Sequence, residues 1–266
     1  DILITTGGGD KDNIAEEILR ELCEHSLAGK NIRYHLVVGR FNPNREKLEQ
    51  YDNNAPKTMN AHLHVLEAYT LLYQCWKDNG LKKRLEFCVD LFMNRIYDPS
   101  RKHFNLFFDN EWNSLVEMDS YGHDVETGWL LCEAARTLEN QDLIEQTNQL
   151  ALDVTEACLA EGMSDKGYMI YEKKGDRKTK HASWWGQIET VIACVNAWQI
   201  SGSDVYLQSV DTVWTFVKDH MVDKEYGEWY SDCFDGEPKK EAPKVSMWRC
   251  PYHTVRLGVE MYNRLK

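Results

Sequence analysis

Long apolar runs are missing from this chain. None approaches the roughly 20 consecutive apolar residues that a helix needs to span a lipid bilayer. An excess of positive charge is missing as well, because 31 Lys and Arg face 43 Asp and Glu, giving a formal net charge of −12. Such an acidic protein repels nucleic acids and anionic membrane surfaces. We therefore expect neither a nucleic acid nor a membrane as a partner.

Signals for export and for disulfide bonding are also missing. The opening stretch "DILITTGGGDKDN" has neither the basic start nor the apolar core of a secretory signal, and it lacks an initiator methionine, which indicates a start further upstream. No CxxC pair occurs among the eight cysteines, and most of them lie in apolar helical patterns, where a thiol behaves as a small hydrophobe. These features favour a cytoplasmic protein with reduced thiols over the alternative, a disulfide set or a zinc site.

The composition is that of a folded protein. The 266 residues are 42% hydrophobic and 28% charged, enough for a packed core in one large domain or two small ones. Residues 1–51 and 56–266 differ in pattern. We predict a short α/β segment over 1–51, followed by a mainly α region over 56–266.

The first segment reads as strand, turn, helix and strand. Residues 2–4 are apolar, glycines 7–9 permit a tight turn, and an apolar helical face follows over 14–22. "IRYHLVVGRF" is typical of a second strand. Glycines before a helix are able to bind a phosphate group. Since neither GK[ST] nor GxGxxG is present, an ordinary tight turn is favoured over a phosphate site.

Apolar residues three and four apart predict about seven helices in the second region. The predicted helices cover roughly 58–76, 81–92, 124–138, 142–160, 184–200, 204–221 and 251–264.

Aromatic, glycine-containing loops separate the helix pairs and look like hairpins. They begin near His103, Gly167 and Gly227, at intervals of 64 and 60 residues. The regular spacing indicates a repeat of two helices and a hairpin. Such repeats close into a ring of inner and outer helices or stack in a row. Seven helices are too few for a closed double ring.

A polar stripe runs along the first predicted helix of this region. Asn60, His64 and Glu67 are four and three residues apart, so they share one face. A solvated face is the simplest reading, but the stripe is amide, imidazole and carboxylate instead of the usual Lys and Glu. A metal site at "HLH", residues 62–64, is disfavoured because helical residues two apart point in different directions.

Similar groups stand at the starts of later helices: His123 with Glu126, Trp184 with Trp185, and Trp248 with His253. In a ring of helix pairs these starts converge at one end of the central cavity. Aromatic rings stack on the C–H faces of sugars, and polar groups bind sugar hydroxyls. Two histidines without a metal-ligand spacing favour proton transfer.

Several of these stretches resemble the cellobiose 2-epimerase branch of the N-acylglucosamine 2-epimerase family. The motifs that carry the resemblance occur in family order over about residues 56–266: "KTMNAHLHVLEAYTLLY", "SYGHDVETGWLL", "WWGQIETVIACVNAWQISG", "GEWYSDCFDGEP" and "MWRCPYHTVRL". The resemblance implies an (α/α)6 barrel and reversible inversion at C2 of a reducing-end sugar, such as that of a β-1,4-linked disaccharide.

The resemblance also implies a role for each matched residue. His123 and His253 form the acid/base pair, and Glu126 orients and polarises His123. Asn60 and His64 hold the substrate, while Trp248 and one of Trp184 and Trp185 stack on the sugar. The implied reaction removes the C2 proton of the open-chain aldehyde, forms an enediol and returns a proton on the other face. This scheme requires no metal and no other cofactor, and imidazoles suit it because their unperturbed pKa is about 6.5.

The chain departs from the family pattern at its start. The family barrel begins with about five more helices, which supply an Arg and a Tyr to the site. Residues 1–51 instead resemble, over one strand–helix–strand unit, the nucleotide-sugar-binding half of a two-domain glycosyltransferase. One such unit does not build a nucleotide cleft, so we expect no working nucleotide-sugar site. We expect weak or absent activity from this chain, and self-association through exposed helix flanks.

Other functions remain as alternatives. The chain could be a carbohydrate-binding remnant without catalysis, or an N-acylglucosamine or monosaccharide 2-epimerase or isomerase. An α-solenoid would bind proteins through varied surface residues. A glycoside hydrolase would need two carboxylates roughly 5–9.5 Å apart, for which Glu67, Glu126 and Glu189 are candidates.

Overall fold

The computed structural model describes residues 2–5, 34–37, 55–246 and 249–266, in two compact units that divide between residues 54 and 55. In the first unit, strands β1 (Ile2–Thr5) and β2 (Tyr34–Val37) pair in parallel. Parallel strands need a crossover connection, as the predicted strand–helix–strand order supplies. The predicted glycine turn at 7–9 and helix at 14–22 lie outside the described residues.

The second unit is mainly helical, which confirms the predicted fold class. Its described part contains seven α-helices: α3 (Met59–Cys75), α4 (Asn79–Leu91), α5 (Tyr121–Leu138), α6 (Gln141–Gly162), α7 (Trp184–Ser201), α8 (Val205–Phe216) and α9 (Tyr252–Arg264). Five-residue π-helical segments, Phe92–Ile96 and Val217–Met221, extend α4 and α8. The seven helices predicted over residues 56–266 are confirmed, with ends that differ by a few residues.

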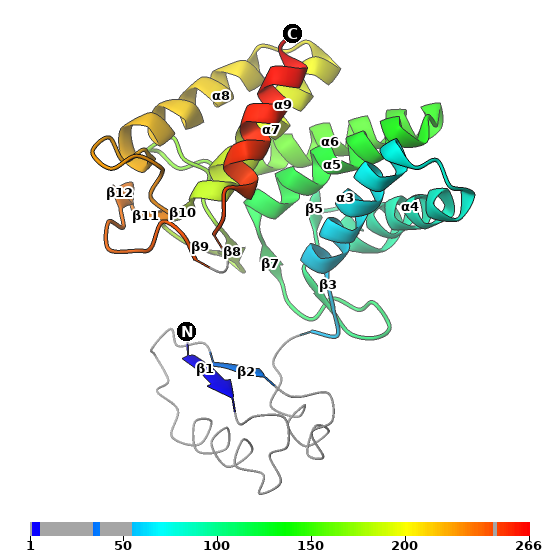
Figure 1. Ribbon diagram of the computed structural model, residues 1–266, viewed down its shortest axis with the longest axis horizontal. Coiled ribbons are helices and arrows are strands. Elements are labelled where there is room, and N and C mark those ends of the chain that lie inside the picture. The colour runs from blue at the N-terminus through cyan, green and yellow to red at the C-terminus, as the bar shows by residue number, and fades with distance from the viewer. Residues whose placement is uncertain (1, 6–33, 38–54, 247–248) are drawn as a thin grey trace, which may run out of the picture. The chain divides into compact units, whose positions relative to one another are not determined.

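The helices form two layers (Figure 1). The inner helices follow one another in the order α3, α5, α7 and α9, each packing on the next. Helices α4, α6 and α8 pack outside, each against the inner helix that precedes it. This arrangement is part of an α/α barrel made of helical hairpins.

Helices α5 and α7 are buried along most of their length, polar residues included. They approach closely at their N-terminal turns, where a Cβ on Gly122 would lie only 3.1 Å from the Cα of Gly186. Two glycines at the crossing allow the backbones to meet. The close crossing brings the first turns of the two helices, and the side chains they carry, together.

Short strands lie at the same end as these first turns. They are β3 (Lys57–Thr58), β4 (Tyr97–Asp98), β5 (His103–Phe104), β6 (Phe107–Phe108), β7 (Met118–Asp119), β8 (Lys173–Lys174), β9 (Arg177–Lys178), β10 (His181–Ser183), β11 (Asp232–Phe234) and β12 (Glu237–Pro238). Antiparallel sheets β7–β8–β9 and β10–β11–β12 lead into α5 and α7. The Ser183 hydroxyl accepts from the Gly186 N–H at 3.2 Å and so caps α7. These sheets fix where the inner helices begin.

Helices α3 and α9, the first and last of the four inner helices, carry apolar side chains that are exposed to solvent. On α9, Val255 and Val259 are 59% and 50% exposed, and on α3 Leu71 is 56% exposed. Apolar residues four apart on a helix share one face, so α9 carries an uncovered apolar stripe. Among the described residues, no helix combines the length and apolar character that crossing a membrane demands.

Candidate functional site

Two histidines converge on one tryptophan at the first turns of the inner helices. The Trp185 ring lies 4.5 Å from the His123 ring and 5.7 Å from the His253 ring, between centroids. The two imidazole centroids are therefore at most about 10 Å apart, the sum of these distances. A separation above roughly 15 Å would have ruled out one shared site, because each histidine must come within hydrogen-bond reach of the same substrate. The observed separation is compatible with one shared site.

His123 is held by a hydroxyl group. Its Nδ1 lies 2.7 Å from the Ser120 Oγ, just before the start of α5. Burial, together with the positive charges that His64 and His253 can carry, lowers the pKa of His123 to about 4. The ring is thus neutral at neutral pH and able to accept a proton.

The resemblance implies that Glu126 orients and polarises His123, and the structure describes a different partner for its carboxylate. Its carboxylate accepts a hydrogen bond from Arg256 at 2.5 Å, and its side chain is 1% exposed. Residues three apart on a helix are neighbours but need not bond to each other. Here Glu126 bonds to the Arg256 guanidinium, and His123 bonds to the Ser120 hydroxyl.

His253 is held by a carboxylate from another helix. Its Nδ1 lies 2.7 Å from Oε1 of Glu189, on α7, and the Trp129 indole N–H donates to the other Glu189 oxygen at 3.0 Å. Glu189 is fully buried. The carboxylate therefore fixes the orientation of the imidazole ring.

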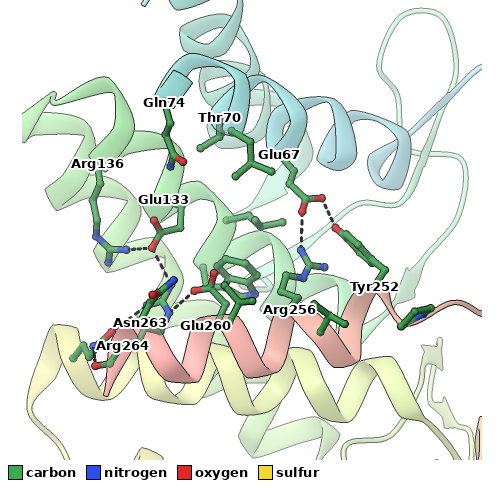
Figure 2. Close-up of a pocket in the computed structure, with 17 residues that line it drawn as sticks. Glu67, Thr70, Gln74, Glu133, Arg136, Tyr252, Arg256, Glu260, Asn263 and Arg264 are labelled. Carbon is green, nitrogen blue, oxygen red and sulfur yellow. Dashed lines mark hydrogen bonds and ion pairs between the residues drawn. The ribbon is translucent and has the colours of Figure 1, made fainter. Parts of the chain in front are cut away.

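Arg256 connects the four inner helices. From α9 it donates to Glu67 on α3 at 3.1 Å, to Glu126 on α5, and it lies 3.1 Å from Glu189 on α7. Tyr252 also donates to Glu67, as Figure 2 shows. Burial and the neighbouring Glu189 carboxylate raise the pKa of Glu126 well above its usual range. Two buried carboxylates, Glu126 and Glu189, and the partly buried Glu67 thus surround one cation.

The same groups offer metal-ligand atoms. Donor atoms of Glu126, Glu189 and His253 lie within 4.8 Å of one another. However, Arg256 already contacts all three side chains, with its nitrogen 3.3 Å from Nδ1 of His253. Since the guanidinium supplies the positive charge there, these residues do not fit a metal ion while Arg256 stays in place.

The predicted substrate-binding residues surround this centre only in part. Asn60 and His64 are exposed on α3, and His64 Nδ1 lies 3.2 Å from Glu67. Trp185 is 9% exposed and contacts both histidines, whereas Trp184 is less buried and lies 6.3 Å from the His253 ring. Trp248 lies outside the described residues.

A cavity of about 890 Å³ opens between α3, α5 and α9 (Figure 2). It shares Glu67, Tyr252 and Arg256 with the centre described above and continues along the helices away from the histidines. The remaining lining residues are Thr70, Leu71, Gln74, Trp129, Leu130, Glu133, Arg136, Gln199, Pro251, Val255, Val259, Glu260, Asn263 and Arg264.

A second buried pair supports the first turn of α5. His103 Nδ1, on β5, lies 2.7 Å from Oδ2 of Asp124, and the other Asp124 oxygen accepts from the Phe104 N–H at 3.0 Å. Asp124 follows His123 directly. The pair therefore ties the β4–β5 hairpin to the turn that carries His123.

Sequence reasoning missed the residues that hold the histidines. Glu189 was considered only as a hydrolase carboxylate, and neither Ser120 nor Arg256 was considered at all. One signal was available for Arg256. It follows His253 by three residues, as Glu67 follows His64 and Glu126 follows His123. The same histidine spacing therefore recurs, with a positive side chain in place of the negative one.

A family model and similar curated proteins place the chain in the same protein family. The model of the family described as N-acylglucosamine 2-epimerase (GlcNAc 2-epimerase) matches residues 20–256. The chain is 37% identical to the cellobiose 2-epimerase of Bacteroides fragilis, over 96% of this chain and 66% of that protein. It is 33% identical to the cellobiose 2-epimerase of Dictyoglomus turgidum, over 94% of this chain and 63% of that protein. The first of these matches includes most of residues 1–51.

Solved structures show the same relationship. The cellobiose 2-epimerase of Bacillus thermoamylovorans superposes with a TM-score of 0.77 at 35% identity, covering 82% of this chain and 56% of that one. A D-mannose isomerase, at 13% identity and a TM-score of 0.52, shares the fold. The chain thus spans somewhat less than two thirds of the length of the curated relatives that it matches.

Proposed function

Because the chain belongs to the N-acylglucosamine 2-epimerase family, we propose that it is the C-terminal part of a carbohydrate 2-epimerase acting on the reducing-end sugar of a β-1,4-linked disaccharide such as cellobiose. The relatives named above are cellobiose 2-epimerases, which motivates this choice of substrate. The observation that carries the proposal is the convergence of His123 and His253 on Trp185, each with a different hydrogen-bond partner.

Inversion at C2 needs proton transfer on two faces of the sugar. After the ring opens, the aldehyde acidifies the C2 proton, and one imidazole removes it to give an enediol. A second imidazole then returns a proton to C2 on the opposite face. A single base would return the proton to the face it came from, so two separately held histidines suit inversion.

The surroundings of the two imidazoles suit complementary roles. His123, whose pKa is lowered to about 4, is neutral and ready to accept the C2 proton. His253, whose Nδ1 lies 2.7 Å from the Glu189 carboxylate, is held in place by that contact for proton transfer at the other face. In the reverse reaction the C2 proton is removed from the opposite face of the sugar, so the histidine that donated a proton now accepts one and the other histidine donates.

Neighbouring groups then hold the sugar. We assign hydroxyl binding to Asn60 and His64, which are exposed on α3. Trp185 supports both imidazoles, so Trp184 is the better candidate to stack on a sugar ring, together with Trp248. Glu126 acts through Arg256 and so is a positioning residue.

Glycoside hydrolysis is a weaker candidate. A hydrolase needs an acid and a base or nucleophile roughly 5–9.5 Å apart, both free to reach the scissile bond. Here Glu67, Glu126 and Glu189 all contact the same guanidinium, Arg256. None of the three is free to act on a substrate.

The test is incubation with cellobiose in deuterated water. Epimerisation produces glucosyl-mannose with deuterium at C2, hydrolysis produces glucose, and binding alone produces neither. We expect slow exchange from the 266-residue chain and faster exchange from a version extended by the N-terminal third of the Bacteroides fragilis relative. An open site admits water, which weakens the hydrogen bonds that stabilise an enediol.

His123→Asn and His253→Asn in the extended version are each expected to abolish epimerisation. Each replaces one imidazole by an amide of similar polarity that cannot accept or release a proton at neutral pH. Release of glucose, or equal rates in the extended wild type and both variants, would show that the two-histidine reaction is wrong. Equal rates in the short and extended wild types would show that the additional helices are dispensable.

A further inference from the structure

We propose that Arg256 is a positioning residue that offsets the charge of Glu189, so that His253 is able both to release and to take up a proton. The proposal rests on the proposed function and deepens it. It concerns a side chain on the last inner helix that contacts His253 through the shared carboxylate. Arg256 itself does not have to touch the substrate.

The hydrogen positions follow from the partners. An ionised carboxylate only accepts hydrogen bonds, so the 2.7 Å contact with Glu189 places a proton on Nδ1 of His253. Nδ1 then has no lone pair for Arg256, whose nitrogen is 3.3 Å away. That nitrogen donates instead to the Glu126 oxygen at 2.5 Å and lies 3.1 Å from the Glu189 oxygen. The proton needed for catalysis is therefore handled at Nε2.

Charge makes Arg256 necessary. A fully buried carboxylate beside an imidazole would hold the ring in its positive form, and such a ring cannot accept a C2 proton. The Arg256 guanidinium contacts the same Oε1 of Glu189 that His253 contacts, so it cancels much of that attraction. The side chain of Arg256 is 8% exposed, and solvent therefore screens this effect only weakly.

The other charged and titratable groups around the His253–Arg256 pair come from every inner helix: His64 and Glu67 on α3, His123 and Glu126 on α5, Glu189 on α7 and Tyr252 on α9. Loss of the guanidinium would leave carboxylates in excess. We therefore expect His253 to become more basic in any variant that removes this charge.

A matched control lies two turns further along the same helix. Arg264 is 7% exposed and donates to Glu133 on α5 at 2.8 Å and to Asn196 on α7 at 3.1 Å. Like Arg256, it connects α9 to α5 and α7 through guanidinium hydrogen bonds to buried or partly buried side chains, but no contact with a histidine is described for it. A purely structural role for Arg256 predicts the same outcome for both arginines.

The experiment is a pH titration of the histidine side chains by NMR in the 15N-histidine-labelled 266-residue chain, with His253→Gln assigning the signal of interest. In the wild type, the neutral ring is expected to carry its proton on Nδ1. Arg256→Met and Arg256→Gln are expected to raise the midpoint of His253 by roughly 1–3 pH units. Arg256→Lys restores a positive charge and is expected to bring the midpoint back towards the wild type, while Arg264→Met leaves it in place.

The proposal is overturned if the neutral Arg256 variants leave the midpoint unchanged, if Arg264→Met shifts it equally, or if Arg256→Lys fails to reverse the shift. Thermal unfolding of each variant checks that the fold is retained, and Arg256→Gln serves where Arg256→Met does not fold. The titration needs no catalysis. Absence of epimerisation by the extended version in deuterated water would therefore refute the proposed function without changing the result of the titration. In an active extended version, the acid limb of the kcat profile is expected to move with the midpoint.

Discussion

The crossing of α5 and α7 allows a sharp test of how the candidate site is supported. Replacing Gly122 by Ala adds one methyl group at this crossing. An ideal Cβ there would lie 2.7 and 2.9 Å from two carbon atoms of the Trp185 indole and 3.1 Å from the Gly186 Cα. Ordinary contacts begin near 3.4 Å. The indole would have to move, yet His123 and His253 already contact it.

The magnitude follows from two opposing effects. Overpacking a well-packed core costs about 1–3 kcal/mol, and the upper end applies because the added Cβ would also lie 3.1 Å from the Gly186 backbone, which cannot move as freely as a side chain. Replacing a helical Gly by Ala returns up to about 1 kcal/mol. We expect a net loss of about 2 kcal/mol, which lowers the melting temperature by roughly 4–8 °C in a protein of this size.

The matched control is Gly258→Ala on α9. Gly258 is exposed, and a Cβ there would meet nothing within 4 Å. This variant therefore gains the helix propensity alone, and we expect its melting temperature to rise by roughly 2–4 °C. Differential scanning calorimetry measures both. If Gly122→Ala were as stable as Gly258→Ala, the close contact between Gly122 and Trp185 would not exist.

Two further outcomes concern a buried pair and an exposed stripe. Burial opposes a charge on His103, but the hydrogen bond and charge of Asp124 outweigh it and raise the His103 pKa. The His103–Asp124 pair therefore stabilises the fold below about pH 6.5 and loses that effect as pH rises through the raised pKa of His103. In urea unfolding, the free energy of unfolding of the wild type should exceed that of His103→Gln by roughly 1 kcal/mol more at pH 5.5 than at pH 8.5. An equal difference at the two pH values would contradict this. Val255 and Val259 leave apolar surface uncovered on α9, so sedimentation velocity should show association that a double change to Glu removes, and identical profiles would place the association elsewhere.

Local patterns were enough to predict the helices and their pairing. Apolar spacing predicted α3 to α9, and the regular intervals of aromatic loops predicted helical hairpins, because both signals depend on neighbours along the chain. The candidate histidines were also predicted, since His123 and His253 stand at helix starts that a ring of repeats brings together. Their meeting on Trp185, instead of across open space, depends on the close glycine crossing, which no spacing rule specifies.

Hydrogen-bond partners were beyond the reach of sequence patterns. The family resemblance implied that Glu126 orients His123, which lies one helical turn before it. The structure gives Glu126 to Arg256, which is 130 residues away in the chain. A buried carboxylate takes the strongest available donor, and a guanidinium forms a stronger charged hydrogen bond than a neutral imidazole. Such competition between distant partners is decided only when the helices are packed together.

The internal repeat gives a physical reason for an arginine at this position. Glu67, Glu126, Glu189 and Arg256 follow one another at intervals of 59, 63 and 67 residues, one on each inner helix. Repeats place equivalent residues at the same level around the axis, so three glutamates of like charge would meet in a buried space. Like charges held this close cannot all be ionised without a counter-charge. The fourth repeat keeps the histidine of the first two and replaces the glutamate three residues later by an arginine, which supplies that counter-charge from within the fold. If a second repeat also carried an arginine at this level, two cations would face only two carboxylates. If no repeat carried an arginine there, the Glu189 carboxylate beside His253 would lack the positive charge that we propose adjusts the basicity of His253.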